Sequence, residues 1–163
     1  MKEFELGNIN HLALVCKDVK NTIDFYTTTL GLSLIKIMEM PNGGKHFFFD
    51  IGNGGALAFF WFPNAPEAAP GIASMSPDAH LTGNIATAHA SMNHVAFNVP
   101  LEKLEEYREN LIAQGVQVTP ISRADFISSF YFFDPNGILL EFAANVRALG
   151  DPVLDLQHSL IQS

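Results

Sequence analysis

Two histidines and one glutamate occur in apolar segments, where their side chains could bind a metal ion. His11 and His94 each follow an asparagine and precede a mostly apolar stretch, while Glu141 interrupts an apolar run. A single histidine in such a segment is more often structural than a ligand, but a buried carboxylate needs a partner or a metal. Two imidazoles and one carboxylate leave coordination positions open, as at catalytic metal sites. We therefore predict that His11, His94 and Glu141 bind one divalent metal ion.

The two histidines occupy equivalent positions of an internal repeat. The segment at 9–15 aligns with the segment at 92–98, and the offset between them is 94 minus 11, which equals 83. Asn, His and Ala recur in register, and both segments have the apolar character of short strands. Side chains alternate between the faces of a strand, so each histidine shares its face with a small alanine. The alanines leave room for both imidazoles to approach a common ion.

Each half of the chain has the pattern of a strand, a helix and three further strands. A glycine follows each expected helix, and an Asn-Gly turn separates the last two strands of the second half. We expect two modules within a single domain spanning 1–163, with module 1 at 8–62 and module 2 at 92–143, joined by a linker at 63–91 and followed by a tail at 144–163. The expected helices span 19–30 and 101–114, and the extended stretches that follow them span 32–40 and 116–121.

The composition excludes several classes of partner. The net charge is -8 and Lys and Arg form no cluster, so a nucleic-acid-binding surface is not expected. The longest apolar run is far shorter than the ~20 residues of a membrane helix. The first residues lack the apolar segment of a secretory signal, and there is 1 cysteine, Cys16, which we expect to be buried. We expect a cytoplasmic protein that binds a small-molecule substrate and has no membrane partner.

A duplicated βαβββ unit with a histidine on the first strand of each half resembles the vicinal-oxygen-chelate superfamily. Its members include glyoxalase I, extradiol dioxygenases and bleomycin-resistance proteins. The resemblance covers residues 8–143 and includes the turn Asp134-Pro135-Asn136-Gly137. It implies an α+β fold in which two βαβββ modules form a curled mixed sheet around a metal cleft. It also implies that His11, His94 and Glu141 are the ligands and that the protein is a homodimer.

One departure from the family pattern bears on the reaction. The repeat offset takes Glu141 back to Ala58, and an offset smaller by one takes it to Phe59, and neither side chain can bind a metal. Glyoxalase I chemistry resembles proton shuttling between two carboxylates, whereas extradiol dioxygenases use three ligands. The segment 131–141 is similar to the extradiol signature, although the upstream histidine of that signature is missing. The resemblance thus implies an extradiol-type dioxygenase acting on a vicinal-diol aromatic substrate, with Fe(II) favoured and Mn(II), Zn(II) or Ni(II) as alternatives.

Catalytic residues follow from the same resemblance. Tyr131 corresponds to a tyrosine that contacts the substrate hydroxyl or oxygen, and its alternative is an aromatic residue at a strand edge. His80 precedes His94 by 94 minus 80, or 14, which is near the spacing of the acid/base histidine in extradiol enzymes. His89 is a second candidate for that role. For both histidines the alternative is a solvated loop position.

Four further residues are candidates for substrate binding. His46 would face the substrate or lie at the surface, and Phe49 and Phe59 would line an apolar pocket or belong to the core. Arg123 would meet an anionic group or form an ion pair in solvent.

Two other functions stay open on sequence grounds. A metal-dependent isomerase, lyase or epimerase would use the same ligands but needs a base that the sequence does not identify. A drug-sequestering protein of the bleomycin-resistance type would need no metal, and the three predicted ligands argue against it.

Overall fold

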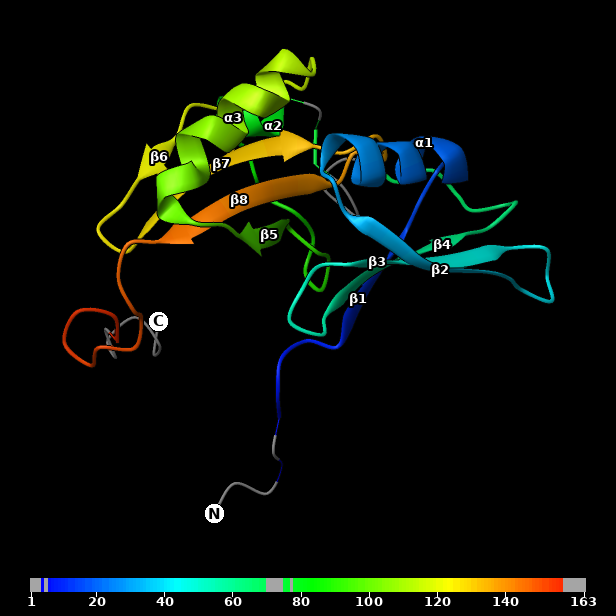
Figure 1. Cartoon of the computed structure of the whole chain (residues 1–163), viewed down its shortest axis with the longest axis horizontal. Helices are drawn as coiled ribbons and strands as arrows, with labels where there is room; N and C mark the ends of the chain where they lie inside the picture. The colour runs from blue at the N-terminus through cyan, green and yellow to red at the C-terminus, as the bar shows by residue number, and fades with distance from the viewer. Residues whose placement is uncertain (1–3, 5, 70–74, 77, 157–163) are drawn as a thin grey trace. The chain divides into compact units, whose positions relative to one another are not determined.

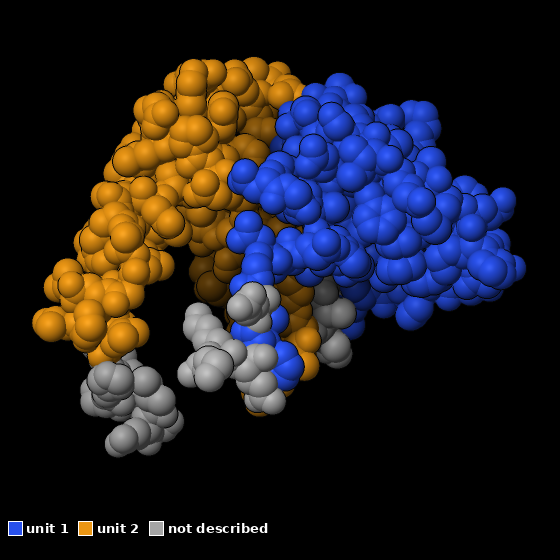
Figure 2. Space-filling model, turned by 60° about the horizontal axis from the view of Figure 1, so that its bottom comes forward, with its two compact units in different colours: residues 1–69, 134–137 blue, residues 70–133, 138–163 orange. Residues whose placement is uncertain are grey.

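The computed structural model describes residues 4, 6–69, 75–76 and 78–156, and the chain divides into two compact units. Unit 1 contains residues 1–69 and 134–137, and unit 2 contains residues 70–133 and 138–163 (Figure 2). Parts of the expected linker and the end of the expected tail lie outside the described residues. Each unit is built from one of the two sequence repeats and is described by itself.

Unit 1 is a four-stranded mixed sheet with one helical segment (Figure 1). The sheet order is β1-β4-β3-β2, with β1 parallel to β4 and the other neighbours antiparallel. This is the expected βαβββ unit. Its elements are β1 (His11–Val15), α1 (Val19–Asp24), the π-helix η1 (Phe25–Thr29), β2 (Ser33–Glu39), β3 (Lys45–Asp50) and β4 (Ala56–Trp61).

The helix of unit 1 begins and ends where the sequence predicts. The Asp18 side chain accepts a hydrogen bond from the backbone N–H of Asn21 at 2.7 Å, which satisfies a donor that the first helical turn leaves free. Gly31 follows the last helical turn with a φ of 73°, a conformation that glycine adopts without strain. α1 and η1 together therefore confirm the helix expected over 19–30.

The core of unit 1 lies on one face of the sheet. Three phenylalanines on this face have no exposed surface: Phe47 and Phe49, two residues apart on β3, and Phe59 on β4, which pairs directly with Phe47. The Tyr26 ring packs against Phe49 and Phe59, with ring centroids 5.2 and 5.1 Å apart. Removal of these rings from water supplies most of the driving force for this side of the fold.

Unit 2 repeats the same topology. Its sheet order is β5-β8-β7-β6, with β5 parallel to β8 and the other neighbours antiparallel. Leu104 and Leu111 on α3 are buried, and so are Phe130 and Phe132 on β7. The elements are α2 (Ala79–Thr82), β5 (Val95–Asn98), the 3-10 helix η2 (Leu101–Lys103), α3 (Leu104–Ala113), β6 (Ser122–Arg123), β7 (Ile127–Phe133) and β8 (Leu139–Asn145).

The extended stretch expected over 116–121 is wrong in position. Only Val118 forms a bridge there, with Phe132, and the strand β6 begins after Pro120. Proline has no backbone N–H to donate to a sheet, so it interrupts pairing at this edge. Thr119 compensates, because its side-chain oxygen accepts a hydrogen bond from the Tyr131 backbone N–H at 3.0 Å.

The turn between β7 and β8 belongs to the second repeat in sequence but packs within unit 1. The Tyr26 hydroxyl donates a hydrogen bond to Asp134 Oδ2 at 3.1 Å, and both side chains are buried. The Lys17 backbone N–H donates to Asn136 Oδ1 at 2.8 Å. Burial raises the pKa of the Tyr26 hydroxyl well above its ordinary value, with the Asp134 carboxylate adding to the effect, so the tyrosine stays a donor.

Strand pairing confirms the repeat offset. Ala13 on β1 pairs with Ala58 on β4, and Ala96 on β5 pairs with Glu141 on β8. Both differences, 96 minus 13 and 141 minus 58, equal 83. Ala58 is thus the structural counterpart of Glu141, and unit 1 carries no carboxylate at that position. Among the described residues, no helix has the length and apolar character that crossing a membrane requires.

Candidate metal and substrate site

His94 and Glu141 form a close pair on one face of the unit 2 sheet. The Nε2 atom of His94 lies 3.1 Å from Oε2 of Glu141, and the Glu141 side chain is 7% exposed. His94 stands directly before β5, and Glu141 lies on β8, which has β5 on one side and β7 on the other. A central strand holds the carboxylate in place from both sides.

Tyr131 and Ser129 complete the surroundings of the carboxylate. Tyr131 pairs directly with Glu141 in the antiparallel register, and the two residues therefore share a face with Ser129. The Tyr131 ring lies edge-on to the His94 ring, with centroids 5.6 Å apart. Ser129 is buried and was not predicted from the sequence, because only its position two residues before Tyr131 would have indicated this face.

Two opposing effects act on the ionisation of Glu141. Burial raises the pKa of the Glu141 carboxyl, but hydrogen bonds from His94, Ser129 and Tyr131 outweigh burial, so the pKa lies below its ordinary value. Burial also raises the pKa of the Tyr131 hydroxyl, and its hydrogen bond to Glu141 acts in the same direction. At neutral pH the site therefore contains an anionic carboxylate and a protonated phenol.

An asparagine orients the histidine in each repeat. Nδ1 of His94 lies 2.7 Å from Oδ1 of Asn93, and Nδ1 of His11 lies 2.8 Å from Oδ1 of Asn10. A carbonyl oxygen only accepts, so Nδ1 carries the proton and Nε2 is the atom left for a ligand. Such hydrogen bonds to the second ring nitrogen are the usual way in which proteins orient metal-binding imidazoles. The recurrence of Asn before His in the sequence was the signal for this arrangement.

The donor atoms of the His94–Glu141 pair suit a divalent cation. With Nδ1 bound to Asn93, Nε2 faces Oε2 of the Glu141 carboxylate at 3.1 Å. A divalent ion would bind both this nitrogen and this oxygen. The residues present therefore fit the metal that the sequence predicts.

The third predicted ligand, His11, lies in unit 1 on the exposed edge strand β1. Its ring contacts Phe48 edge-on at 5.8 Å, as His94 contacts Tyr131, which is the counterpart of Phe48 in the second repeat. Within the described parts of the chain, no group of three or more His, Cys, Asp or Glu side chains is close enough together to hold a metal ion. His94 and Glu141 belong to unit 2, so the role of His11 as a third ligand stays a prediction.

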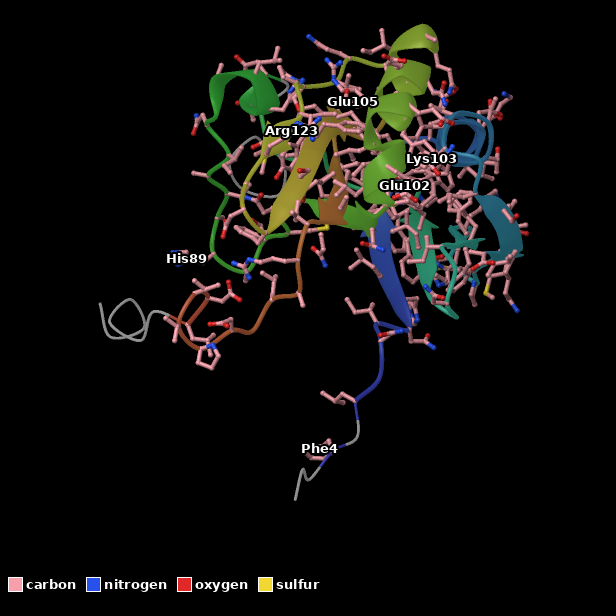
Figure 3. All side chains as sticks on the ribbon, turned by 60° about the vertical axis from the view of Figure 1, so that its left-hand side comes forward. Phe4, His89, Glu102, Lys103, Glu105 and Arg123 are labelled. Atoms are coloured by element: carbon pink, nitrogen blue, oxygen red, sulfur yellow. The ribbon has the colours of Figure 1, made fainter. Side chains whose placement is uncertain are left out.

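His80 lies on α2, beside the face that carries Glu141. Ala79 packs with Leu139, and Tyr131 and Phe133 pack against the same cluster. The His80 ring lies edge-on to Phe133 at 5.0 Å, and neither ring nitrogen is exposed or has a hydrogen-bond partner among the described residues. Burial lowers the pKa of His80, while the nearby Asp78 carboxylate opposes this, so the ring is neutral at pH 7. His89, the other candidate, is exposed (Figure 3).

The four residues predicted to bind substrate lie in different surroundings. Phe49 and Phe59 are fully buried around Tyr26, so we assign them to the core instead of a ligand-binding surface. His46 is half-buried on the opposite face of the same sheet. Arg123 forms an ion pair with Glu105 at 2.6 Å, and both side chains are exposed (Figure 3). This pair accounts for the Arg123 charge without an anionic ligand.

Comparisons with known proteins agree with this architecture. Residues 8–142 match the family described as the Glyoxalase/Bleomycin resistance protein/Dioxygenase superfamily. The chain is 28% identical to the protein YwkD of Bacillus subtilis (strain 168) over 141 residues, which is 83% of this chain and 95% of YwkD. It is 25% identical to Glyoxylase I 4 of Arabidopsis thaliana over 158 residues, covering 97% of this chain and 80% of that protein.

Solved structures share the fold. The crystal structure of SMU.1112c has a TM-score of 0.66 and 26% identity, covering 85% of this chain and 99% of the other. A mutant of the genomically encoded fosfomycin resistance protein FosX from Listeria monocytogenes has a TM-score of 0.59 and 21% identity, covering 89% of this chain and 96% of the other. That FosX structure is a complex with Mn(II) and 1S,2S-dihydroxypropylphosphonic acid.

Proposed function

Because the chain belongs to the Glyoxalase/Bleomycin resistance protein/Dioxygenase superfamily, we propose that it is a metal-dependent enzyme acting on a small molecule with two adjacent oxygen atoms. The observation that carries this proposal is the pairing of His94 Nε2 with the buried Glu141 carboxylate at 3.1 Å. A carboxylate with almost no exposed surface is costly unless a cation or hydrogen-bond donors compensate it. A structural role alone would be served equally well by apolar residues at both positions.

The ligands that we propose are His94, Glu141 and His11. The first two come from unit 2, and His11 is carried from the sequence repeat, where it matches His94 in its Asn partner and in its aromatic neighbour. A divalent ion held by this set would act as a Lewis acid on the substrate oxygens and, if it is Fe(II), would also supply redox chemistry.

Two neighbouring side chains would handle protons. The Tyr131 hydroxyl stays protonated because its pKa is raised. When a substrate binds beside Glu141, this hydroxyl would turn from the carboxylate and donate its hydrogen bond to a substrate oxygen. The neutral His80 has no hydrogen-bond partner among the described residues and packs beside Phe133, on the same face as Tyr131. It is suited to accept a proton from a substrate hydroxyl, because burial lowers its pKa and keeps the ring neutral.

Within the superfamily we favour an extradiol-type dioxygenase acting on an aromatic vicinal diol. Ala58 stands where a second carboxylate would be needed for proton shuttling between two such groups. The Tyr131–Glu141 pairing supports the likeness to the extradiol signature that the sequence indicated. Fe(II) is then the favoured ion, although the Mn(II) found with FosX supports a divalent ion in general.

The test is metal content combined with oxygen consumption. Protein purified without oxygen and loaded with Fe(II), Mn(II), Zn(II) or Ni(II) would be assayed with catechol in an oxygen electrode. Oxygen uptake that depends on both Fe(II) and catechol, and is lost in Glu141→Gln, is the expected result. Fe(II)-loaded protein that takes up no oxygen with any catechol would contradict the dioxygenase proposal.

A metal-dependent isomerase or lyase is the second candidate. The similarity to Glyoxylase I 4 extends over 97% of this chain and favours it, and His80 would then be the base. This reaction would proceed with Zn(II), Ni(II) or Mn(II) and would consume no oxygen. Turnover of the methylglyoxal–glutathione hemithioacetal by such protein, without oxygen uptake, would support the second candidate over the first.

A further inference from the structure

Unit 1 carries a set of partly exposed aromatic rings on the sheet face opposite its core. This set, which we call the aromatic face, consists of His46 and Phe48 on β3, Phe60 on β4 and Phe62 just after β4. Strand register places His46 opposite Phe60, and Phe48 opposite Ala58, on one side of the sheet. All four rings are half-buried, whereas the three phenylalanines on the other side, Phe47, Phe49 and Phe59, have no exposed surface.

Three of the four rings of the aromatic face are aligned in parallel. His46 and Phe60 stack with centroids 3.8 Å apart and an angle of 2° between the planes. Phe60 and Phe62 continue the arrangement at 5.6 Å and 6°. Phe48 lies 4.3 Å from His46 at a tilt of 60°. A planar ring is the kind of ligand that extends such a column, because stacked aromatic groups attract one another beyond their apolar contact.

The fold does not require aromatic side chains at these positions. The repeat offset takes His46 to Ser129 and Phe60 to Ala143, and both pairs have the same register in their sheets. Unit 2 therefore builds the same sheet with a serine and an alanine where unit 1 has two stacked rings. Partly exposed rings that the architecture can do without indicate a binding role.

Two polar groups on this face define the ligand further. His46 Nδ1 lies 2.9 Å from the Phe59 carbonyl oxygen, which accepts its proton and fixes the ring, so Nε2 is the ring atom left to accept a hydrogen bond. Lys36 on β2 pairs with Phe48 in the antiparallel register and so lies on the same face. Lys36 is exposed and forms no ion pair with any described residue. An anionic group on the ligand would complement its charge.

We propose that the aromatic face binds a planar aromatic carboxylate, which is the substrate class of this protein. The aromatic ring stacks on the column of His46, Phe60 and Phe62, a hydroxyl of the ligand donates to His46 Nε2, and the carboxylate faces Lys36. That this ligand is the substrate of an enzyme rests on the proposed function. The binding itself concerns unit 1 alone and can be measured without a metal.

The experiment titrates the full chain with 2-naphthoate in the presence of EDTA and follows binding by calorimetry. Decahydro-2-naphthoate, the saturated and non-planar analogue, tests the need for a flat ring. We expect 2-naphthoate to bind and the saturated acid to bind much more weakly. Phe60→Leu should weaken 2-naphthoate binding about fivefold, as expected for a lost stacking contact, and Lys36→Met by roughly threefold, as for an exposed charge.

The matched control is Phe25→Leu, which alters a half-buried ring of the same unit that packs against Tyr26 on the core side. This variant should bind 2-naphthoate like the wild type, and circular dichroism would verify that all variants are folded. No binding of 2-naphthoate, equal binding of the saturated acid, or an unchanged affinity in Phe60→Leu would each overturn the proposal.

The outcome separates this proposal from the proposed function. If Glu141→Gln abolishes metal uptake while metal-free binding of 2-naphthoate stays sensitive to Phe60→Leu, both proposals stand. If 2-naphthoate binds only to metal-loaded protein and is indifferent to Phe60→Leu, the aromatic face is not the binding site and the metal site is unaffected. If the wild-type protein takes up no metal but shows the Phe60-dependent binding, the proposed function fails and the aromatic face remains.

Discussion

The Nε2 atom of His94, directly before β5, and the Oε2 atom of Glu141, on the parallel neighbour β8, lie 3.1 Å apart within unit 2. The carboxylate is buried and receives hydrogen bonds from His94, Ser129 and Tyr131. An arrangement of this kind stabilises a negative charge in the interior. It also brings together two groups that bind divalent cations.

The first prediction concerns the charge of the carboxylate. Glu141→Gln keeps the size of the side chain but removes the anion, so Mn(II) affinity should fall by roughly 100-fold or more, because the direct ligand is lost. Isothermal titration with Mn(II) measures this. Glu105→Gln is the control, since Glu105 is an exposed glutamate paired with Arg123, and its Mn(II) affinity should equal that of the wild type. Equal affinities in both variants would contradict the role of Glu141.

The second prediction concerns the asparagine that orients His94. Asn93→Ala removes the acceptor that lies 2.7 Å from His94 Nδ1, and Mn(II) affinity should fall about tenfold, as is typical for the hydrogen-bond partners of ligating histidines. Proton–nitrogen NMR of the ring would report the tautomer directly in metal-free protein. Asn98→Ala, at an exposed position on β5, is the control and should alter neither the Mn(II) affinity nor the tautomer of His94. An unchanged tautomer in Asn93→Ala would show that the asparagine has no orienting role.

The third prediction follows from the lowered pKa of Glu141. A carboxyl whose pKa is lower in the folded than in the unfolded state contributes stability above its unfolded pKa, and that stability is lost as the pH falls through the folded pKa. The difference in unfolding free energy between wild type and Glu141→Gln should therefore shrink as the pH is lowered from 7 through the acidic range. Urea denaturation of metal-free protein at several pH values measures it. A difference that stays constant or grows on acidification would be incompatible with the lowered pKa.

The fourth prediction concerns the buried hydrogen bond within unit 1. Tyr26→Phe removes the donor to Asp134 Oδ2 and should lower the free energy of unfolding by about 1–3 kcal/mol, because the buried acceptor loses a partner. Tyr107→Phe, at a half-buried position on α3, removes a hydroxyl from a ring elsewhere and should change stability much less. If thermal and urea unfolding give the same small change for both variants, the Tyr26–Asp134 contact contributes little.

The repeat made much of the fold predictable. The recurrence of an identical Asn-His-x-Ala pattern indicated two equivalent strands, and the observed registers of Ala13 with Ala58 and Ala96 with Glu141 have the same offset as the pattern. Local signals, such as Asp18 before α1, also specified the helix ends correctly.

Other features depend on contacts that a sequence pattern does not encode. Alternation separates Phe47 and Phe49 from His46 and Phe48, but only packing on Tyr26 decides which set is the core, so the expected pocket residues Phe49 and Phe59 became core residues. Arg123 meets Glu105, which lies earlier in the chain on α3, and no local pattern indicates that pairing. Ser129 likewise enters the site only because β7 pairs with β8 in a particular register.

The most direct test of the metal site is electron paramagnetic resonance of the full chain loaded with Mn(II), after growth with ¹⁵N-labelled histidine. Electron spin echo modulation should show coupling to an imidazole nitrogen, and this coupling should weaken or vanish in His94→Ala together with most of the Mn(II) uptake. A His94→Ala protein that is folded, binds the same amount of Mn(II) and gives the same nitrogen coupling as the wild type would contradict the assignment of His94 as a ligand and with it the proposed metal site.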